Sequence, residues 1–196
     1  MIPVASTIVM AGALLPPDNF PRTNLLEDYE YGGDALNNST NGLRTKVWHG
    51  RWDAGSETVF LNPVGEPEIP ILVTGPGVTE ISISFDQSMR PAIAYMVEGE
   101  LFFWWFDSVA NAMTTTSYVN CYSPMLSLDD HRPQLLGSSD ILLFYLKGRR
   151  VYFRAQRERY LTEHAFGSQD LPLGESRITN VGLSDKLRMQ VEVKTV

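Results

Sequence analysis

Cysteine is almost missing from the sequence: Cys121 is the only one in 196 residues, so no disulfide can form within the chain. A fold built without disulfides is typical of a reducing compartment such as the bacterial cytoplasm. No neighbouring histidine is available to lower the pKa of the thiol. We therefore expect Cys121 to be a packed apolar side chain and not a nucleophile.

Positive charge is also scarce, since 16 Lys and Arg face 23 Asp and Glu and give a net charge of -7 at pH 7. Proteins that bind nucleic acid normally carry a basic surface, so this balance argues against that class. No apolar run reaches the ~20 residues that a membrane-spanning helix needs. The apolar stretch "MIPVASTIVMAGALLPP" is shorter and carries no basic residue, so we expect it to bury against protein, such as a neighbouring subunit.

Patterns for metal binding and catalysis are weak. Asp129, Asp130 and His131 are adjacent, and three successive side chains on an extended chain point to alternating sides. His49 and His164 have no further ligand three or four residues away. Two carboxylates that converge in space would suit a glycan-cleaving enzyme, but no pair is indicated by the sequence. We expect no metal, no cofactor and no catalytic residue.

Short β patterns begin after a segment that has none. Residues 1–42 are rich in Pro, Gly, Asn and Asp without periodicity, which predicts an extended N-terminal arm anchored by residues such as Tyr29. Residues 43–196 predict a mainly β domain of antiparallel sheets, because stretches such as "TEISISFD" alternate apolar and polar residues. Aromatic hairpins turn at "EG" and "KG", and a strand over 183–194 closes the chain. The stretch "RAQRERYLTEHAF" fits either a helix or an outer strand.

One unit occurs twice. The stretch Ser84-Phe85-Asp86 recurs 43 residues later as Ser127-Leu128-Asp129, and an Arg-Pro pair and an aromatic hairpin follow each copy. A period near 43 residues with about four short strands is typical of a propeller blade. We predict blade-like units near 78–120 and 121–166, or alternatively a β-sandwich. Two units do not close a ring, so we expect the chain to form a homo-oligomer.

The repeated Asp and Arg-Pro residues predict a structural turn. A short carboxylate at a strand end accepts hydrogen bonds from N–H groups two or three residues later, and proline fixes the start of the next strand. The predicted turn residues are Asp86, Arg90, Pro91, Asp129, Arg132 and Pro133.

Trp104, Trp105 and an arginine-rich hairpin are candidates for contacts with other molecules. Adjacent residues of a strand face opposite sides, so one indole faces outward, where a subunit covers it or a sugar ring stacks on it. The arginines form either a solvated strand face or a surface that pairs with acids of a neighbouring chain. The predicted subunit interface consists of Trp104, Trp105, Arg150, Arg154, Arg157 and Tyr29.

Several stretches together resemble a family. "FDQSMRPAIAYMVEGELFFWWFDS", "SPMLSLDDHRP", "SSDILLFYLKGRRVYFRAQRERY" and "VGLSDKLRMQVEV" are similar to virion proteins of tailed bacteriophages that are encoded among podovirus-like tail genes. "YEYGGDALNNSTNGL" before "VWHGRW" extends the resemblance over most of residues 28–193. It implies a multi-copy structural tail protein, made in the host cytoplasm, whose partners are portal, adaptor, nozzle or fibre proteins. It implies no catalysis.

Two other functions stay open. An outward Trp104 or Trp105 on a propeller-like module would suit a carbohydrate-binding or receptor-binding protein. A glycan-cleaving enzyme is the third possibility. We favour the structural tail component, because an arm and an edge-rich β domain are suited to an assembly in which neighbours cover what a monomer exposes.

Overall fold

The computed structural model describes residues 30–38, 45–63, 67–86, 90–128, 141–168, 170–183 and 188–195. These ranges consist mainly of antiparallel strands, and their one helical element is a 3-10 turn at Gln156–Glu158. The prediction of a mainly β chain with antiparallel sheets is confirmed. Among the described residues, no helix has the length and apolarity to cross a membrane.

The strands form three four-stranded sheets and one two-stranded sheet, each a simple antiparallel meander. The first sheet consists of β1 (Glu30–Asn38), β2 (Thr45–Asp53), β3 (Thr58–Pro63) and β4 (Ile69–Val73). The second consists of β5 (Val78–Phe85), β6 (Pro91–Val97), β7 (Glu100–Asp107) and β8 (Ala112–Tyr118). The third consists of β9 (Tyr122–Leu128), β10 (Ile141–Lys147), β11 (Arg150–Ala155) and β12 (His164–Phe166), and the last of β13 (Ser176–Leu183) and β14 (Met189–Thr195).

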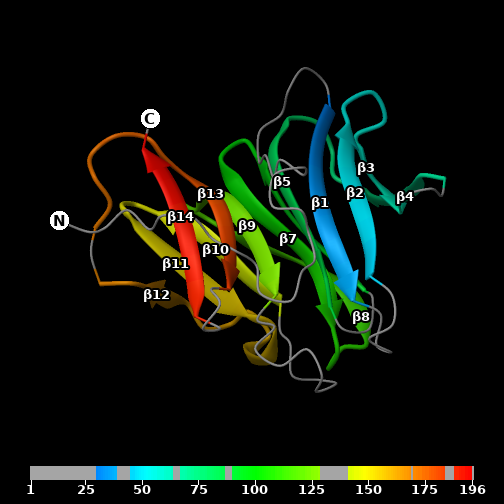
Figure 1. The fold of residues 1–196 in the computed structure, drawn as a ribbon. Helices are drawn as coiled ribbons and strands as arrows, with labels where there is room; N and C mark the ends of the chain where they lie inside the picture. Colours follow the sequence, from blue (N-terminus) through cyan, green and yellow to red (C-terminus); the bar gives the residue numbers. More distant parts are fainter. Residues whose placement is uncertain are drawn as a thin grey trace.

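The four sheets follow one another across the molecule in the order of the sequence (Figure 1). The first strand of each sheet lies against the first strand of the next, so that β1 contacts β5, β5 contacts β9, and β9 contacts β13. This is the arrangement of successive blades in a propeller. Sheets β5–β8 and β9–β12 occupy the two ranges for which the sequence predicts blade-like units.

Two segments differ from the sequence prediction. Glu30–Asn38, assigned to the arm, is a strand that pairs with β2 over its whole length. Gly32 and Gly33 weaken the sequence pattern of this strand, which is formed by backbone pairing with β2. The predicted strand over 183–194 is also wrong in its extent, since Leu183 ends β13 and β14 begins at Met189. Residues 1–29, with Tyr29, lie outside the described residues.

Apolar side chains fill a layer between each pair of sheets. The layer between β1–β4 and β5–β8 contains Trp52 and Ile93, and the layer between β5–β8 and β9–β12 contains Phe103 and Tyr145. A third layer, with Phe144, joins β9–β12 to β13–β14. The inner strands are buried on both faces, and their sequences are therefore continuous apolar runs such as "AIAYM" and "ILLFYL".

Serine side chains join the first strands of neighbouring sheets. The hydroxyl oxygen of Ser82 on β5 accepts a hydrogen bond of 2.9 Å from the backbone N–H of Leu126 on β9. The hydroxyl oxygen of Ser123 on β9 accepts one of 2.8 Å from the backbone N–H of Ile178 on β13. Both bonds are buried, so the contact of β5 with β9 and the contact of β9 with β13 each contain a buried hydrogen bond between a serine hydroxyl and a backbone N–H group.

Candidate functional site

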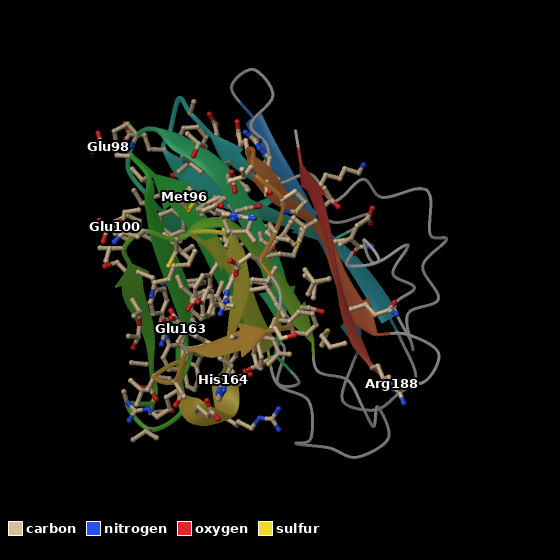
Figure 2. The ribbon with its side chains drawn as sticks, turned by 90° about the vertical axis from the view of Figure 1, so that its left-hand side faces the viewer. Met96, Glu98, Glu100, Glu163, His164 and Arg188 are labelled. Carbon is tan, nitrogen blue, oxygen red and sulfur yellow. The ribbon has the colours of Figure 1, made fainter. Side chains whose placement is uncertain are left out.

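A cluster of aromatic and charged side chains lies where sheet β5–β8 meets sheet β9–β12. Tyr145 and Tyr152 are cross-strand partners, and alternation along β10 and β11 brings further side chains to the same face. Figure 2 shows Glu163 on the same side of the molecule as the β6–β7 hairpin residues Glu98 and Glu100. We call this site the seam cluster, and its members are Tyr118, Tyr145, Lys147, Tyr152, Arg154 and Glu163.

Three tyrosine rings form the apolar part of the seam cluster. The ring of Tyr145 stacks on Tyr118 from β8 at 6.1 Å between centroids and on Tyr152 from β11 at 6.3 Å. Two cations lie over the ends of this stack, with Arg154 4.6 Å from the Tyr118 centroid and Lys147 5.8 Å from the Tyr152 centroid. The seam therefore presents flat aromatic surface beside positive charge.

Arg154 holds the cluster together. Its Nε donates to the Tyr145 hydroxyl at 2.9 Å, and its Nη2 donates to a Glu163 carboxylate oxygen at 3.2 Å. Its Nη1 donates to the carbonyl oxygens of Tyr160 and Leu161, both at 2.9 Å. The side chain is only 14% exposed. The prediction that Arg154 lies at the rim is wrong, because the loop after β11 folds back and accepts hydrogen bonds from its donors. Pairing of Arg154 or Arg157 with a neighbouring chain stays a prediction.

Glu163 and Lys147 form the accessible part of the cluster. The Glu163 carboxylate accepts hydrogen bonds from the Tyr145 hydroxyl at 2.7 Å and from Lys147 Nζ at 3.0 Å. Burial alone would raise the pKa of Glu163, but these two bonds and the charges of Lys147 and Arg154 outweigh it and lower the pKa. The hydrogen bond with Glu163 raises the pKa of Lys147. Side-chain exposures of 24% and 43% leave an ionised carboxylate and an ammonium group in reach of a ligand.

Burial disfavours the charged forms of two seam tyrosines and of the nearby Cys121. Burial raises the pKa of Tyr118 to about 12 and also raises the pKa of Tyr145. Cys121 lies in the same apolar layer, and burial raises the pKa of its thiol to about 11. A protonated, buried thiol agrees with the expectation that Cys121 packs as an apolar side chain. Within the described residues, no cluster of His, Cys, Asp and Glu is suited to hold a metal ion.

Trp104 and Trp105 both pack against other residues of their own chain. Trp105 is 4% exposed in the layer between β5–β8 and β9–β12, and its Nε1 donates to the Thr116 hydroxyl at 3.3 Å. The prediction of a subunit contact or sugar platform at Trp105 is therefore wrong, because its own chain buries the indole. Trp104 is half-buried and packs against the layer between β1–β4 and β5–β8. Sheet β5–β8 has a packed layer on each of its two faces, so adjacent tryptophans that point to opposite faces both meet other side chains of the chain.

The other predicted interface residues have different surroundings. Arg150 forms an ion pair with Asp170 of its own chain, in which both side chains are 47% exposed. Arg157 is exposed in the 3-10 turn. A role for either residue in a subunit contact stays a prediction.

Asp86 and Arg90 connect β5 to β6. One Asp86 oxygen accepts a hydrogen bond of 2.9 Å from the backbone N–H of Arg90, and the other accepts one of 2.6 Å from Arg90 Nε. The guanidinium of Arg90 also lies 3.9 Å from the centroid of Phe106. The bonded N–H group is four residues after Asp86, not two or three, and Pro91 begins β6. Asp129, Arg132 and Pro133 lie outside the described residues.

Asp86→Ala is expected to destabilise the fold by about 1–2 kcal/mol, because it leaves the Arg90 N–H without its acceptor. Thermal melts of the purified variant measure the effect. Asp129→Ala is expected to cost a similar amount if the repeated residues share one role. Asp170→Ala is the control, since it removes only an exposed partner of Arg150 and is expected to change the melt little. Unchanged melts of both Asp86→Ala and Asp129→Ala would exclude the shared-turn interpretation.

Glu80 on β5 is a buried acid. Its Oε2 atom is buried and has no hydrogen-bond partner among the residues that the structure describes. Burial raises the pKa of Glu80 to about 7, an effect that the charge of Arg177 opposes and the charge of Glu175 increases. An acid whose pKa is higher in the folded state favours folding most when it is protonated. Its contribution to stability is full below the unfolded pKa of 4.5 and is lost as the pH rises through about 7.

Glu80→Gln is therefore expected to be more stable than the parent at pH 8, by about 2 kcal/mol after allowance for partial solvation. The difference is expected to shrink as the pH falls toward the unfolded pKa. Urea denaturation at both pH values measures it. Glu98→Gln, at an exposed hairpin position, makes the same chemical change outside the buried layers and is the control. A Glu80→Gln advantage of equal size at both pH values would show that titration of Glu80 is not its cause.

The comparisons with known proteins support the fold. No family model matches the chain, and neither does any curated protein. Among solved structures, the chain is similar to a point mutant of the β-propeller lectin of Aleuria aurantia in complex with Fucα1-6GlcNAc. The TM-score is 0.51 at 11% sequence identity, and the match covers 82% of this chain and 57% of the lectin chain. At this identity the likeness concerns the fold alone, and of the two predicted architectures it favours the propeller over the sandwich.

Proposed function

We propose that the chain is a carbohydrate-binding propeller module and that the seam cluster holds the sugar. The observation that carries this proposal is the accessible Glu163–Lys147 pair beside the ring of Tyr152. A pyranose has an apolar C–H face that stacks on an aromatic ring, and hydroxyl groups that both donate and accept hydrogen bonds. The ionised carboxylate accepts from one hydroxyl, and the ammonium group donates to its neighbour.

The rigidity of the cluster supports the same proposal. Arg154 and the Tyr145 hydroxyl each donate a hydrogen bond to the Glu163 carboxylate, so its orientation is fixed in the absence of a ligand. A site that is ordered in advance loses less entropy on binding. A neutral sugar is the expected class, because the two accessible charges of the site, on Glu163 and Lys147, are of opposite sign. The fold-level likeness to a lectin in complex with a disaccharide agrees with this function by analogy.

Glycan-array screening followed by titration calorimetry tests the proposal. We expect a neutral glycan to bind, Lys147→Met and Tyr152→Leu to weaken its binding at least about tenfold, and the thermal melt of Lys147→Met to stay close to the parent's. Lys147 is chosen because it is exposed and its removal leaves the Arg154 contacts intact. Arg150→Met on the neighbouring strand β11, where the guanidinium pairs with Asp170 and not with Glu163, is the control and should bind normally. No binding to any glycan, or binding that neither variant reduces, would exclude the seam as a sugar site.

A second proposed function is that of a non-enzymatic, multi-copy component of a phage tail. Besides the sequence resemblance, its support is the shape of the described sheets, an open series that ends in a two-stranded sheet instead of a four-stranded one. An unpaired strand edge is a template for pairing with another chain. The two functions are compatible, since a tail protein that binds sugar would contact the host surface.

Mass spectrometry of purified particles from the phage that encodes this chain tests the second function. We expect the chain to be present in several copies per particle and to remain after washing at high salt. Its absence from mature particles would exclude a structural role in the tail, whatever the outcome of the glycan measurements.

A further inference from the structure

Among the described strands, β14 has one edge without a pairing partner. Among the described strands it pairs only with β13, whereas the three other sheets continue to a fourth strand. Val191 is buried and Met189 and Val193 pack against the layer shared with β9–β12. Gln190, Glu192 and Lys194 alternate with them and therefore lie on the opposite face of the strand. The free edge thus belongs to a strand with one apolar face and one charged face.

We propose that β14 pairs antiparallel with β14 of a second copy of this chain, so that two half-sheets become one four-stranded sheet in the order β13-β14-β14-β13. The partner is a second copy because the side chains of β14 are complementary to themselves. With Val193 opposite Val193 of the partner subunit, Glu192 lies opposite Lys194 of the partner subunit, and the two-fold axis generates the same pair again. Two opposite-charge pairs and one apolar pair then occupy adjacent positions.

Neighbouring registers are less favourable. Centring the pair on Glu192 places that carboxylate opposite its own copy, and centring it on Lys194 does the same for the ammonium group. Centring it on Val191 places Lys194 opposite Arg188. Like charges directly opposite each other destabilise a strand pair. Registers shifted by a single residue would mix the apolar and charged faces. Among these alternatives, the register centred on Val193 is the one without a charge or face conflict.

The pairing does not use the seam cluster. Figure 2 shows Arg188, the residue before β14, on the opposite side of the molecule from Glu163. The contact between two strand edges is small, so we expect a weak dimer in dilute solution. In an assembly that holds many copies close together, the high effective concentration would favour it.

A charge-swap series measured by analytical ultracentrifugation over a range of concentrations tests the proposal. The parent is expected to show a monomer–dimer equilibrium. Glu192→Lys alone and Lys194→Glu alone each place like charges opposite each other and are expected to weaken the dimer by about tenfold. The double variant Glu192→Lys/Lys194→Glu is expected to restore it. A mixture of the two single variants is expected to form heterodimers, since each charge then meets its opposite.

Three results would overturn the proposal. They are a parent that stays monomeric at every concentration, a double variant that stays as weak as the single ones, and a mixture that does not associate. The same change at an exposed site outside β14, Glu98→Lys, controls for net charge. The inference extends the proposed tail role, but its test uses the purified chain alone. A monomeric chain that is nevertheless found in phage particles would exclude this pairing and leave the tail role standing.

Discussion

Tyr160→Ala is expected to destabilise the fold by about 4 kcal/mol, the usual cost of removing a fully buried aromatic ring. Tyr160 is 2% exposed, although it belongs to the loop after the 3-10 turn. Its ring meets Phe103 and Trp105 edge-on, at centroid distances of 4.6 and 4.8 Å. The loop of the third sheet thus inserts its ring into the layer shared with the second sheet, and removing it leaves a cavity between them.

Two further substitutions separate the ring of Tyr160 from its hydroxyl and from the loop. Tyr160→Phe keeps the ring and removes the hydroxyl, which donates a hydrogen bond of 3.2 Å to the Ile141 carbonyl oxygen, for an expected cost of about 1 kcal/mol. Leu161→Ala changes the next residue, which is 76% exposed, and is expected to cost less than about 0.5 kcal/mol. Denaturant unfolding gives all three values. If Tyr160→Ala costs no more than Leu161→Ala, the ring does not hold the two sheets together.

Arg154→Ala is expected to destabilise the fold by about 2–3 kcal/mol, which allows for the partial exposure of the cluster. The substitution leaves the Glu163 carboxylate, the Tyr145 hydroxyl and two backbone carbonyl groups without a shared donor. Arg154→Lys is expected to recover little of the loss, because one ammonium group cannot reach acceptors that a planar guanidinium binds in several directions.

Circular-dichroism melts of Arg154→Ala and Arg150→Ala compare the loss of a half-buried arginine with the loss of an exposed one on the same strand, β11. Arg150 belongs to the same strand, but its ion pair with Asp170 is exposed, so its loss should change the melt little. Equal melts for the two variants would show that Arg154 is a surface residue after all. A large loss for Arg154→Ala would mean that any failure of that variant to assemble reports on its fold and not on a subunit contact.

The strands were predictable where their local pattern is strong. Alternation in "TEISISF" and the Glu98-Gly99 turn mark β5 and the hairpin of β6 and β7, and positive φ angles at both turn residues explain the choice of glycine there. β1 was missed because its glycines and asparagines hide a strand that backbone pairing establishes. The class of fold therefore followed from local signals, whereas the number of sheets did not.

The seam cluster was not predictable in the same way. Strand alternation placed Arg154 on one face of β11 but gave no information on what covers that face. Its partners come from β8, β10 and the loop before β12, up to 36 residues away in the case of Tyr118. Glu163 has no motif around it that distinguishes it from any exposed acid. Such a site is defined by the packing of two sheets, and a single sequence contains no signal for the contact.

The serine bonds between sheets have a consequence for the motions of the chain. The N–H groups of Leu126 and Ile178 each donate to a serine hydroxyl of a neighbouring sheet. A slight separation of two sheets would release these amides to water while every ladder stayed intact. Their hydrogen exchange should therefore need less free energy than that of ladder amides such as those of β10, which exchange only when a sheet itself opens. The exchange rate of the Leu126 amide would therefore report how often β5–β8 separates from β9–β12, and that of the Ile178 amide how often β9–β12 separates from β13–β14.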